Sequence, residues 1–164
     1  MAGEARAWGD FAAAAPWLAR RGRELLERAG VALLGTVRKD GAPRISPIEP
    51  VFTGEQLLIG VMPWSLKARD LVRDSRCVLH SAVGGPDAGE SEFKLYGRAV
   101  EAGEDLRDAR ADAWWVSRPR DDARVLSLAV ERAVLVEWDL GRGEMTLTRW
   151  SPGLGTSRLT RGYP

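Results

Sequence analysis

A serine and a lysine stand where an apolar strand gives way to a helix. The run from Leu57 to Met62 is apolar, Pro63 interrupts it, and the residues from Ser65 to Asp74 have the composition of a short helix with Ser65 as its N-cap. The N-terminus of a helix presents N–H groups without partners inside the helix, and it attracts anions. The junction therefore predicts a site for a phosphate or a similar anion.

Lys67 lies in the first turn of this helix, where a cation opposes the helix dipole by a few tenths of a kcal/mol to about 1 kcal/mol. A bound phosphate would remove that conflict. Arg44 lies on a neighbouring predicted strand, and it would complete a phosphate cradle with Ser65 and Lys67, each charged contact contributing roughly 1.5–3 kcal/mol. The alternative interpretation is that Lys67 only extends into water.

A mainly β domain with short helices is expected to position these groups. The 164 residues are 45% hydrophobic and 29% charged, which is typical of one globular domain covering 1–164. We predict an N-terminal helical segment over 1–30, with an amphipathic helix from Pro16 to Ala29, and an irregular Gly- and Arg-rich tail over 151–164. About six or seven strands, mostly linked by hairpins, favour a small antiparallel barrel.

The predicted strands and a further helix follow from alternation, turn residues and composition. Pro47 and Pro50 interrupt the second strand, and proline cannot donate to a sheet ladder, so this strand is expected at an edge or facing a ligand. The strands are Val31 to Val37, Pro43 to Phe52, Leu57 to Met62, Arg76 to Val83, Glu92 to Glu101, Ala129 to Asp139 and Glu144 to Trp150, and the helix is Asp105 to Ser117, which ends in Trp114-Trp115.

Charge and cysteine content exclude several classes of protein. A net charge of +1 does not support a whole-protein grip on nucleic acid, which requires an excess of basic residues. A single cysteine excludes an internal disulfide, and with one histidine there is no Cys/His set for a tetrahedral metal site. The apolar run from Phe11 to Ala15 is too short for a signal segment or a membrane span. We expect a cytoplasmic protein that does not bind a membrane.

Three stretches resemble the pyridoxamine 5′-phosphate oxidase-like superfamily, the FMN-binding split barrels, and within it the flavin- and deazaflavin-dependent oxidoreductases. They read LLGTVRKDGAPRISPIEPVF, LLIGVMPWSLKARDLVRDSRCVLHS and EFKLYGRAV, and they run in order over roughly residues 24 to 140. The most diagnostic part is the motif from Ser65 to Arg76, and the second is Gly41-Ala42-Pro43. The resemblance implies an antiparallel split β-barrel of Greek-key type.

The resemblance also implies a homodimer with flavin-type cofactors in clefts at the subunit interface. Lys67 and Ser65 would hold the cofactor phosphate, with Arg69 nearby. Trp64 would either stack on the cofactor or cap an end of the barrel. The residues that would line the isoalloxazine or deazaflavin ring are Arg44, Ile45, Ser46, Pro47 and Ile48, and those along the ribityl chain are Val61 and Met62.

The function implied by the resemblance is that of an oxidoreductase that passes a hydride between FMN, or coenzyme F-420, and a small unsaturated substrate. No acid–base pair stands out, so a proton would come from solvent. The tail over 151–164 lacks the basic segment with which the vitamin oxidase of the superfamily holds its substrate, which argues against that vitamin.

The alternative is a non-catalytic flavin- or haem-binding or sensing protein of the same fold. His80 is the one imidazole that could ligate haem. It lies on a predicted strand without a paired motif, so we interpret it as a structural histidine, and Cys77 as a small core residue.

Overall fold

The computed structural model describes residues 7–84, 91–106 and 123–162. The predicted helix from Asp105 to Ser117 lies, from residue 107 onward and with Trp114-Trp115, outside the described residues. The helices are α1 (Trp8–Ala14), α2 (Pro16–Ala29) and α3 (Leu66–Arg73). Nine strands are described: β1 (Ala32–Val37), β2 (Pro43–Ile48), β3 (Val51–Thr53), β4 (Gln56–Val61), β5 (Arg76–Ser81), β6 (Ser91–Glu101), β7 (Arg124–Asp139), β8 (Glu144–Ser151) and β9 (Gly155–Gly162).

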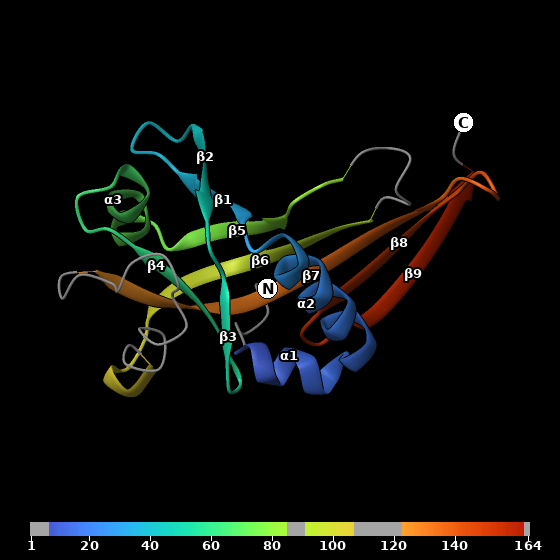
Figure 1. Cartoon of the computed structure of the whole chain (residues 1–164), viewed down its shortest axis with the longest axis horizontal. Coiled ribbons are helices and arrows are strands. Elements are labelled where there is room, and N and C mark those ends of the chain that lie inside the picture. The colour runs from blue at the N-terminus through green and yellow to red at the C-terminus, as the bar shows by residue number, and fades with distance from the viewer. Residues whose placement is uncertain (1–6, 85–90, 107–122, 163–164) are drawn as a thin grey trace.

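The sheet curves until its two ends almost meet. Its strand order is β2-β1-β5-β6-β7-β4-β3, so β2 and β3 stand at opposite ends of the order. Only Glu49 and Pro50 separate β2 from β3 in the chain, and two extended residues span roughly 7 Å. β2 therefore continues almost directly into β3 (Figure 1), and the predicted split β-barrel is confirmed.

The second predicted strand, Pro43 to Phe52, is thus divided into two strands that pair with different neighbours. β2 pairs with β1, whereas β3 pairs with β4. Pro50 lies at the division and has no N–H for a ladder, which explains why continuous pairing stops there.

β7 is the strand at which the sheet splits. It pairs with β6 along its length, with β4 through Arg124 to Ser127, and with β8 from Ala133 onward. A β-bulge interrupts the β6–β7 register between Tyr96 and Gly97. β8 and β9 leave the barrel as a two-stranded arm at the end of the molecule opposite α3 (Figure 1).

The prediction of an irregular tail over 151–164 is wrong, because Gly155–Gly162 form β9, which pairs with β8 along its whole length. Every residue of β9 is exposed. A strand without a buried face has no apolar alternation, so the pattern that identifies other strands is missing here.

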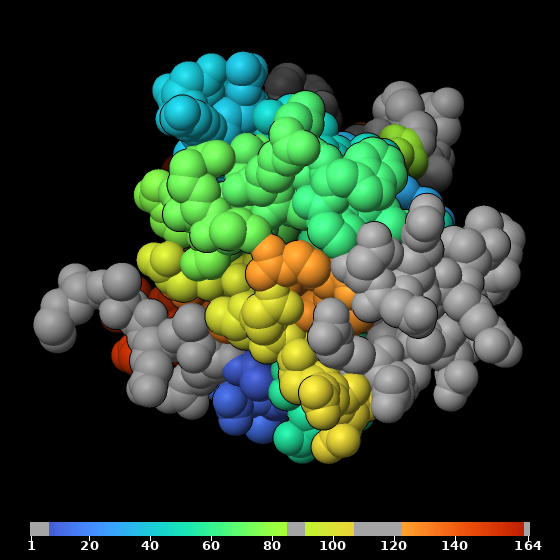
Figure 2. All heavy atoms as spheres, turned by 90° about the vertical axis from the view of Figure 1, so that its left-hand side faces the viewer, coloured from blue at the N-terminus to red at the C-terminus, as the bar shows by residue number. Residues whose placement is uncertain are grey.

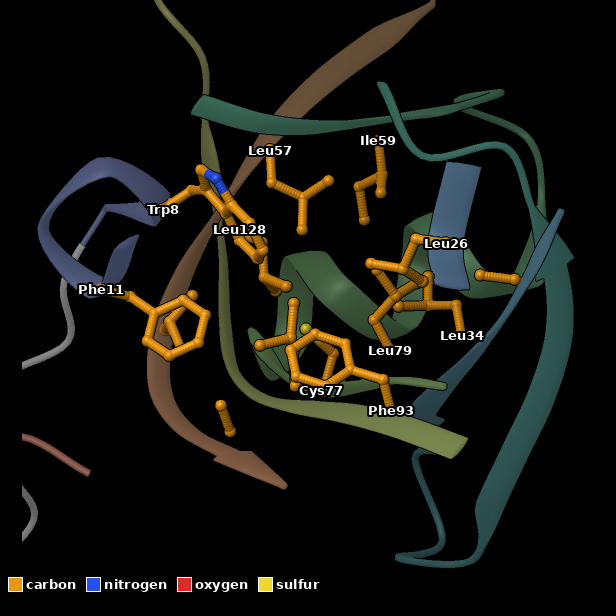
Figure 3. Close-up of a cluster of buried hydrophobic side chains, with 14 of the residues drawn as sticks. Trp8, Phe11, Leu26, Leu34, Leu57, Ile59, Cys77, Leu79, Phe93 and Leu128 are labelled. Carbon is orange, nitrogen blue, oxygen red and sulfur yellow. The ribbon is translucent and has the colours of Figure 1, made fainter. Parts of the chain in front are cut away.

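The hydrophobic core fills the barrel and continues beneath α1 and α2. Leu34, Leu79, Phe93 and Leu128 are fully buried and point toward one another from four different strands (Figure 3). A Cβ built on Gly22 of α2 would lie 2.3 Å from the Phe93 ring, so the helix needs glycine to sit this close to β6. Helices and sheet therefore share one core.

An aromatic cluster fastens α1 to the sheet. The Trp8 ring meets the Phe52 ring edge to face at a centroid distance of 4.7 Å, and the Phe11 ring lies 4.8 Å from that of Trp150.

In the described part of the chain, no helix is long and apolar enough to cross a membrane.

Candidate functional site

A cleft of about 440 Å³ opens where the end of β2 meets the junction between β4 and α3. Trp64 stands at its rim with 68% of its surface exposed, so the cleft is open to solvent. The residues that line the cleft are Val31, Pro47, Ile48, Glu49, Gly60, Met62, Trp64, Ser65 and Lys67.

Ser65 caps α3 as the sequence predicts. Its Oγ accepts a hydrogen bond from the Ala68 N–H at 3.3 Å, and its own N–H donates to the Met62 carbonyl at 2.9 Å. Because a hydroxyl both donates and accepts, the hydroxyl hydrogen of Ser65 remains available to an anion. The turn that begins at Met62 thus directs a donor and the start of a helix into the cleft.

Lys67 crosses the cleft instead of extending into water. Its Nζ donates to the Pro47 carbonyl at 3.0 Å, which ties the first turn of α3 to the end of β2. Burial lowers the pKa of this ammonium from its ordinary value. One of its three N–H groups is used by Pro47, and the other two are available to an anion.

Asp70, on the buried face of α3, organises the neighbouring cations. It is 3% exposed and accepts hydrogen bonds from Thr36 Oγ1 at 3.0 Å, Arg44 Nε at 2.6 Å and Arg73 Nη2 at 3.2 Å. Burial acts to raise the pKa of Asp70, but the hydrogen bonds from Arg44, Thr36 and Arg73 outweigh it and hold the pKa below its ordinary value. The carboxylate therefore stays charged and fixes Arg44 in place.

A second, basic pocket of about 650 Å³ lies on the other side of α3 from the cleft. α3 and the turn between β1 and β2 lie side by side on this face of the molecule, α3 in green and the turn in light blue (Figure 2). Arg38 pairs with Asp40 at 3.0 Å, whereas no carboxylate of the described residues pairs with Lys39 or Arg69. The pocket is lined by Arg38, Lys39, Asp40, Arg44, Leu66, Arg69, Asp70 and Arg73.

The structure gathers some of the predicted site residues and separates others. Lys67, Ser65, Trp64, Met62, Pro47 and Ile48 line the cleft, whereas Arg44 and Arg69 line the basic pocket. In this structure Asp70 holds the Arg44 guanidinium in the basic pocket, so Arg44 does not line the cleft with Ser65 and Lys67, and the predicted three-residue cradle stays a prediction.

Three of the residues that the resemblance places along the cofactor ring or the ribityl chain lie outside both pockets. Ile45 is 70% exposed on the outer face of the sheet, and Val61 is 2% exposed within the hydrophobic core. Ser46 is half-buried on β2 and lines neither pocket.

Sequence reasoning missed Asp70, Thr36, Arg38 and Lys39. Asp70 lies within the motif from Ser65 to Arg76, but its partners Thr36 and Arg44 are 34 and 26 residues away. A charged residue on the buried face of an amphipathic helix is the one local signal that would have pointed to Asp70.

Cys77 and His80 have structural surroundings. Burial raises the pKa of the Cys77 thiol to about 12, and the side chain belongs to the hydrophobic core, as the sequence predicts. His80 Nδ1 lies 2.6 Å from the Ser81 carbonyl, and Nε2 lies 3.4 Å from Glu92 Oε2. Both ring nitrogens therefore face oxygen atoms of the protein.

Comparison with known proteins gives a family for most of the chain. The family model described as pyridoxamine 5′-phosphate oxidase matches residues 18–137. Among curated proteins, no sequence matches this chain.

Several solved structures share the fold. PhzG from Burkholderia lata 383, in complex with tetrahydrophenazine-1-carboxylic acid, superimposes with a TM-score of 0.67 at 12% identity over 90% of this chain and 89% of that one. A pyridoxamine 5′-phosphate oxidase-related, FMN-binding protein from Nostoc punctiforme PCC 73102 gives 0.58 at 17% identity over 92% and 96%. A haem-binding protein from Mycobacterium smegmatis gives 0.57 at 17% identity over 87% of both chains. At these identities the likeness shows the fold alone.

Proposed function

Because this chain belongs to the pyridoxamine 5′-phosphate oxidase family, we propose that it binds FMN in the cleft at Lys67 and is an FMN-dependent oxidoreductase acting on a small unsaturated substrate. The observation that carries the proposal is the meeting, in one cleft, of a partly buried ammonium, a capping hydroxyl and apolar walls. FMN has a phosphate for the first two and a tricyclic ring for the third.

The residues of the cleft fit the phosphate. Lys67 has two N–H groups not used by Pro47, and Ser65 Oγ accepts from the Ala68 N–H while its own hydrogen can be donated to an anion. A phosphate at this position also lies at the positive end of the α3 dipole. It would offset the burial of the Lys67 charge, because an anion nearby favours the ammonium form.

The walls of the cleft fit an apolar, flat group. The apolar walls come from β2 and from the end of β4, and they are formed by Pro47, Ile48 and Met62. The exposed Trp64 offers a large aromatic surface at the rim. Burial of a flavin ring there would cover part of the Trp64 surface that now faces solvent. When bound, FMN supplies the hydride chemistry, while these residues bind it, orient it and keep water from one side of the ring.

The proposal includes a homodimer with the cleft at the subunit interface. Val31, Leu33 and Ile45 are 43%, 44% and 70% exposed on and beside β1 and β2. Leu33 pairs with Pro47 in the sheet, so this apolar surface continues to the cleft itself. A second copy that covers the surface would also close the open side of the cleft.

Coenzyme F-420 is a second candidate cofactor, and the basic pocket is the observation that favours it. This deazaflavin has a longer acidic tail, which needs cations beyond the phosphate site. Lys39 and Arg69 line the pocket without a carboxylate partner among the described residues, and Arg73 lies beside them. FMN leaves these charges unused.

Haem ligation by His80 has less support. A haem iron needs a free ring nitrogen, whereas His80 Nδ1 and Nε2 face the Ser81 carbonyl and the Glu92 carboxylate.

A flavin-binding protein without turnover has the same cleft, so only a turnover assay separates it from the enzyme.

The test is a fluorescence titration of cofactor-free protein with FMN and, in parallel, with F-420. We expect binding of FMN in the low micromolar range. Tight binding of F-420 with weak binding of FMN would replace the first candidate by the second, and binding of neither would contradict both.

Reoxidation of the pre-reduced cofactor is then compared with and without protein across enones and quinones. Acceleration supports an enzyme, and its absence for every acceptor supports a binding protein.

A further inference from the structure

A third hollow, of about 820 Å³, lies beside the β-bulge and the turn between β8 and β9, away from both pockets that flank α3. This volume lies within the range of small-molecule sites, which is roughly 300–1,000 Å³. None of its residues lines the cleft at Lys67 or the basic pocket. The residues that line this arm pocket are Arg76, Cys77, Tyr96, Gly97, Glu131, Arg132, Ser151, Pro152, Gly153 and Leu154.

Among the described residues that line the arm pocket, one charged side chain has no counter-ion. Arg76 pairs with Asp74 at 2.5 Å, and Glu131 pairs with Arg98 at 2.9 Å. Arg132, in contrast, is paired with no carboxylate of the described residues. The described residues of the arm pocket, counted with their partners, therefore carry a net charge of +1.

Tyr96 holds Arg132 in place. The Arg132 Cζ lies 4.0 Å from the centroid of the Tyr96 ring, and the two residues are opposite each other in the β6–β7 ladder. A guanidinium stacked on an aromatic ring keeps its N–H donors at its edge, where a carboxylate accepts two parallel hydrogen bonds. The stack thus orients Arg132 for an anion without neutralising it.

The other walls of the arm pocket are flat or apolar. A Cβ on Gly97 would lie 2.0 Å from the Ala129 carbonyl oxygen, so this position carries no side chain and leaves the floor bare. One side of the pocket is formed by Pro152 and Leu154, which belong to the turn between β8 and β9, and Leu154 is 88% exposed. A large apolar side chain this exposed gains free energy when an apolar group covers it.

We propose that the arm pocket binds a small monocarboxylate with a flat apolar body, such as an aryl carboxylate. Arg132 takes the carboxylate, and Gly97, Pro152 and Leu154 receive the body of the ligand. A single uncompensated cation matches a monoanion, whereas a phosphate dianion would remain half neutralised in a pocket with apolar walls. This site needs no flavin, so it stands independently of the proposed function.

The experiment is calorimetric titration of the full-length protein with 2-naphthoate and with its neutral isostere 2-naphthamide. We expect 2-naphthoate to bind at least tenfold more tightly. Arg132→Met is expected to remove that preference, and Arg132→Lys to keep part of it, since an ammonium lacks the paired donors. The matched control is Arg149→Met, which removes an exposed arginine from β8 outside the pocket and is expected to leave the preference unchanged.

Leu154→Ser tests the apolar wall separately, and it is expected to weaken both probes by a similar factor. The proposal is overturned if the wild-type protein binds acid and amide equally, or binds neither, because that comparison does not depend on any variant folding. It is also overturned if Arg132→Met, with the unfolding temperature of the wild type, still prefers the acid.

Discussion

Two regions of the barrel hold their cations in different ways. At α3, the buried Asp70 accepts hydrogen bonds from Arg44 and Arg73, so two charges are fixed by a third. Near the turn between β8 and β9, Arg132 of β7 is held by the Tyr96 ring, and no carboxylate of the described residues pairs with it. Loss of the ion pairs at Asp70 should therefore lower the free energy of unfolding. Loss of the Arg132 stack should change it much less.

The largest expected effect comes from removing the charge of Asp70. Asp70→Asn leaves Arg44 without its carboxylate, and breaking a buried pair in this way costs about 3 kcal/mol of unfolding free energy, since Arg44 is itself partly exposed. Urea denaturation measures the loss. The control is Glu27→Gln, which breaks an exposed pair with Arg23 on α2 and is expected to cost about 0.4 kcal/mol. Equal losses for the two variants would contradict the role given to Asp70.

Acid pH should remove the same contribution without a mutation. The folded state lowers the pKa of Asp70, so its contribution is complete above the unfolded value of about 3.9 and is lost as the pH falls through the folded value. The difference in unfolding free energy between wild type and Asp70→Asn is therefore expected to shrink below about pH 4. Asp74, whose pKa the Arg76 hydrogen bonds lower to about 2, cancels in this difference. A difference that stays constant down to pH 2 would argue against the ion pair.

A smaller loss is expected from the cap of α3. Ser65→Ala removes the acceptor of the Ala68 N–H, and the loss of an N-cap side chain costs about 1 kcal/mol. Ser65→Thr keeps the hydroxyl and serves as the control, with a loss of a few tenths of a kcal/mol expected. If both variants unfold at the wild-type urea midpoint, the cap contributes nothing to stability.

The smallest effect is expected on the arm. Leu159 lies on β9 with 44% of its surface exposed, and every residue of that strand is exposed. Leu159→Thr keeps a residue that suits a strand, and it should change the unfolding free energy by less than about 0.5 kcal/mol. A loss as large as that of Asp70→Asn would show that the arm packs against more than β8.

The sequence could predict the elements whose signals lie close to them in the chain. α2 was predicted with its observed bounds, because Pro16 occupies the first turn and Gly30, with φ +67°, ends the helix. α3 was predicted from its Ser65 cap. These signals lie within a few residues of the element they define, so one sequence is enough to find them.

The parts that sequence reasoning missed depend on distant partners. β9 is held by its pairing with β8 and has no buried face, and the site of Arg44 is determined by Asp70, 26 residues further along the chain. Pro50 marks the interruption of the second predicted strand in the sequence, but no local pattern reports that its two halves pair with different strands, β1 and β4. Lys67 was placed correctly at the start of α3, but its contact with the Pro47 carbonyl became visible only in the fold.

The measurement that tests the central claim most directly compares FMN with riboflavin, which lacks the phosphate, on the wild type and on Lys67→Ala. If Lys67 contacts the phosphate, the variant is expected to lose about 10- to 100-fold in FMN affinity and to bind riboflavin as the wild type does. Lys39→Ala, in the basic pocket, is the matched control and should bind both ligands normally. Equal weakening of FMN and riboflavin by Lys67→Ala, or no weakening of either in a folded variant, would contradict the assignment of the cleft as the phosphate site.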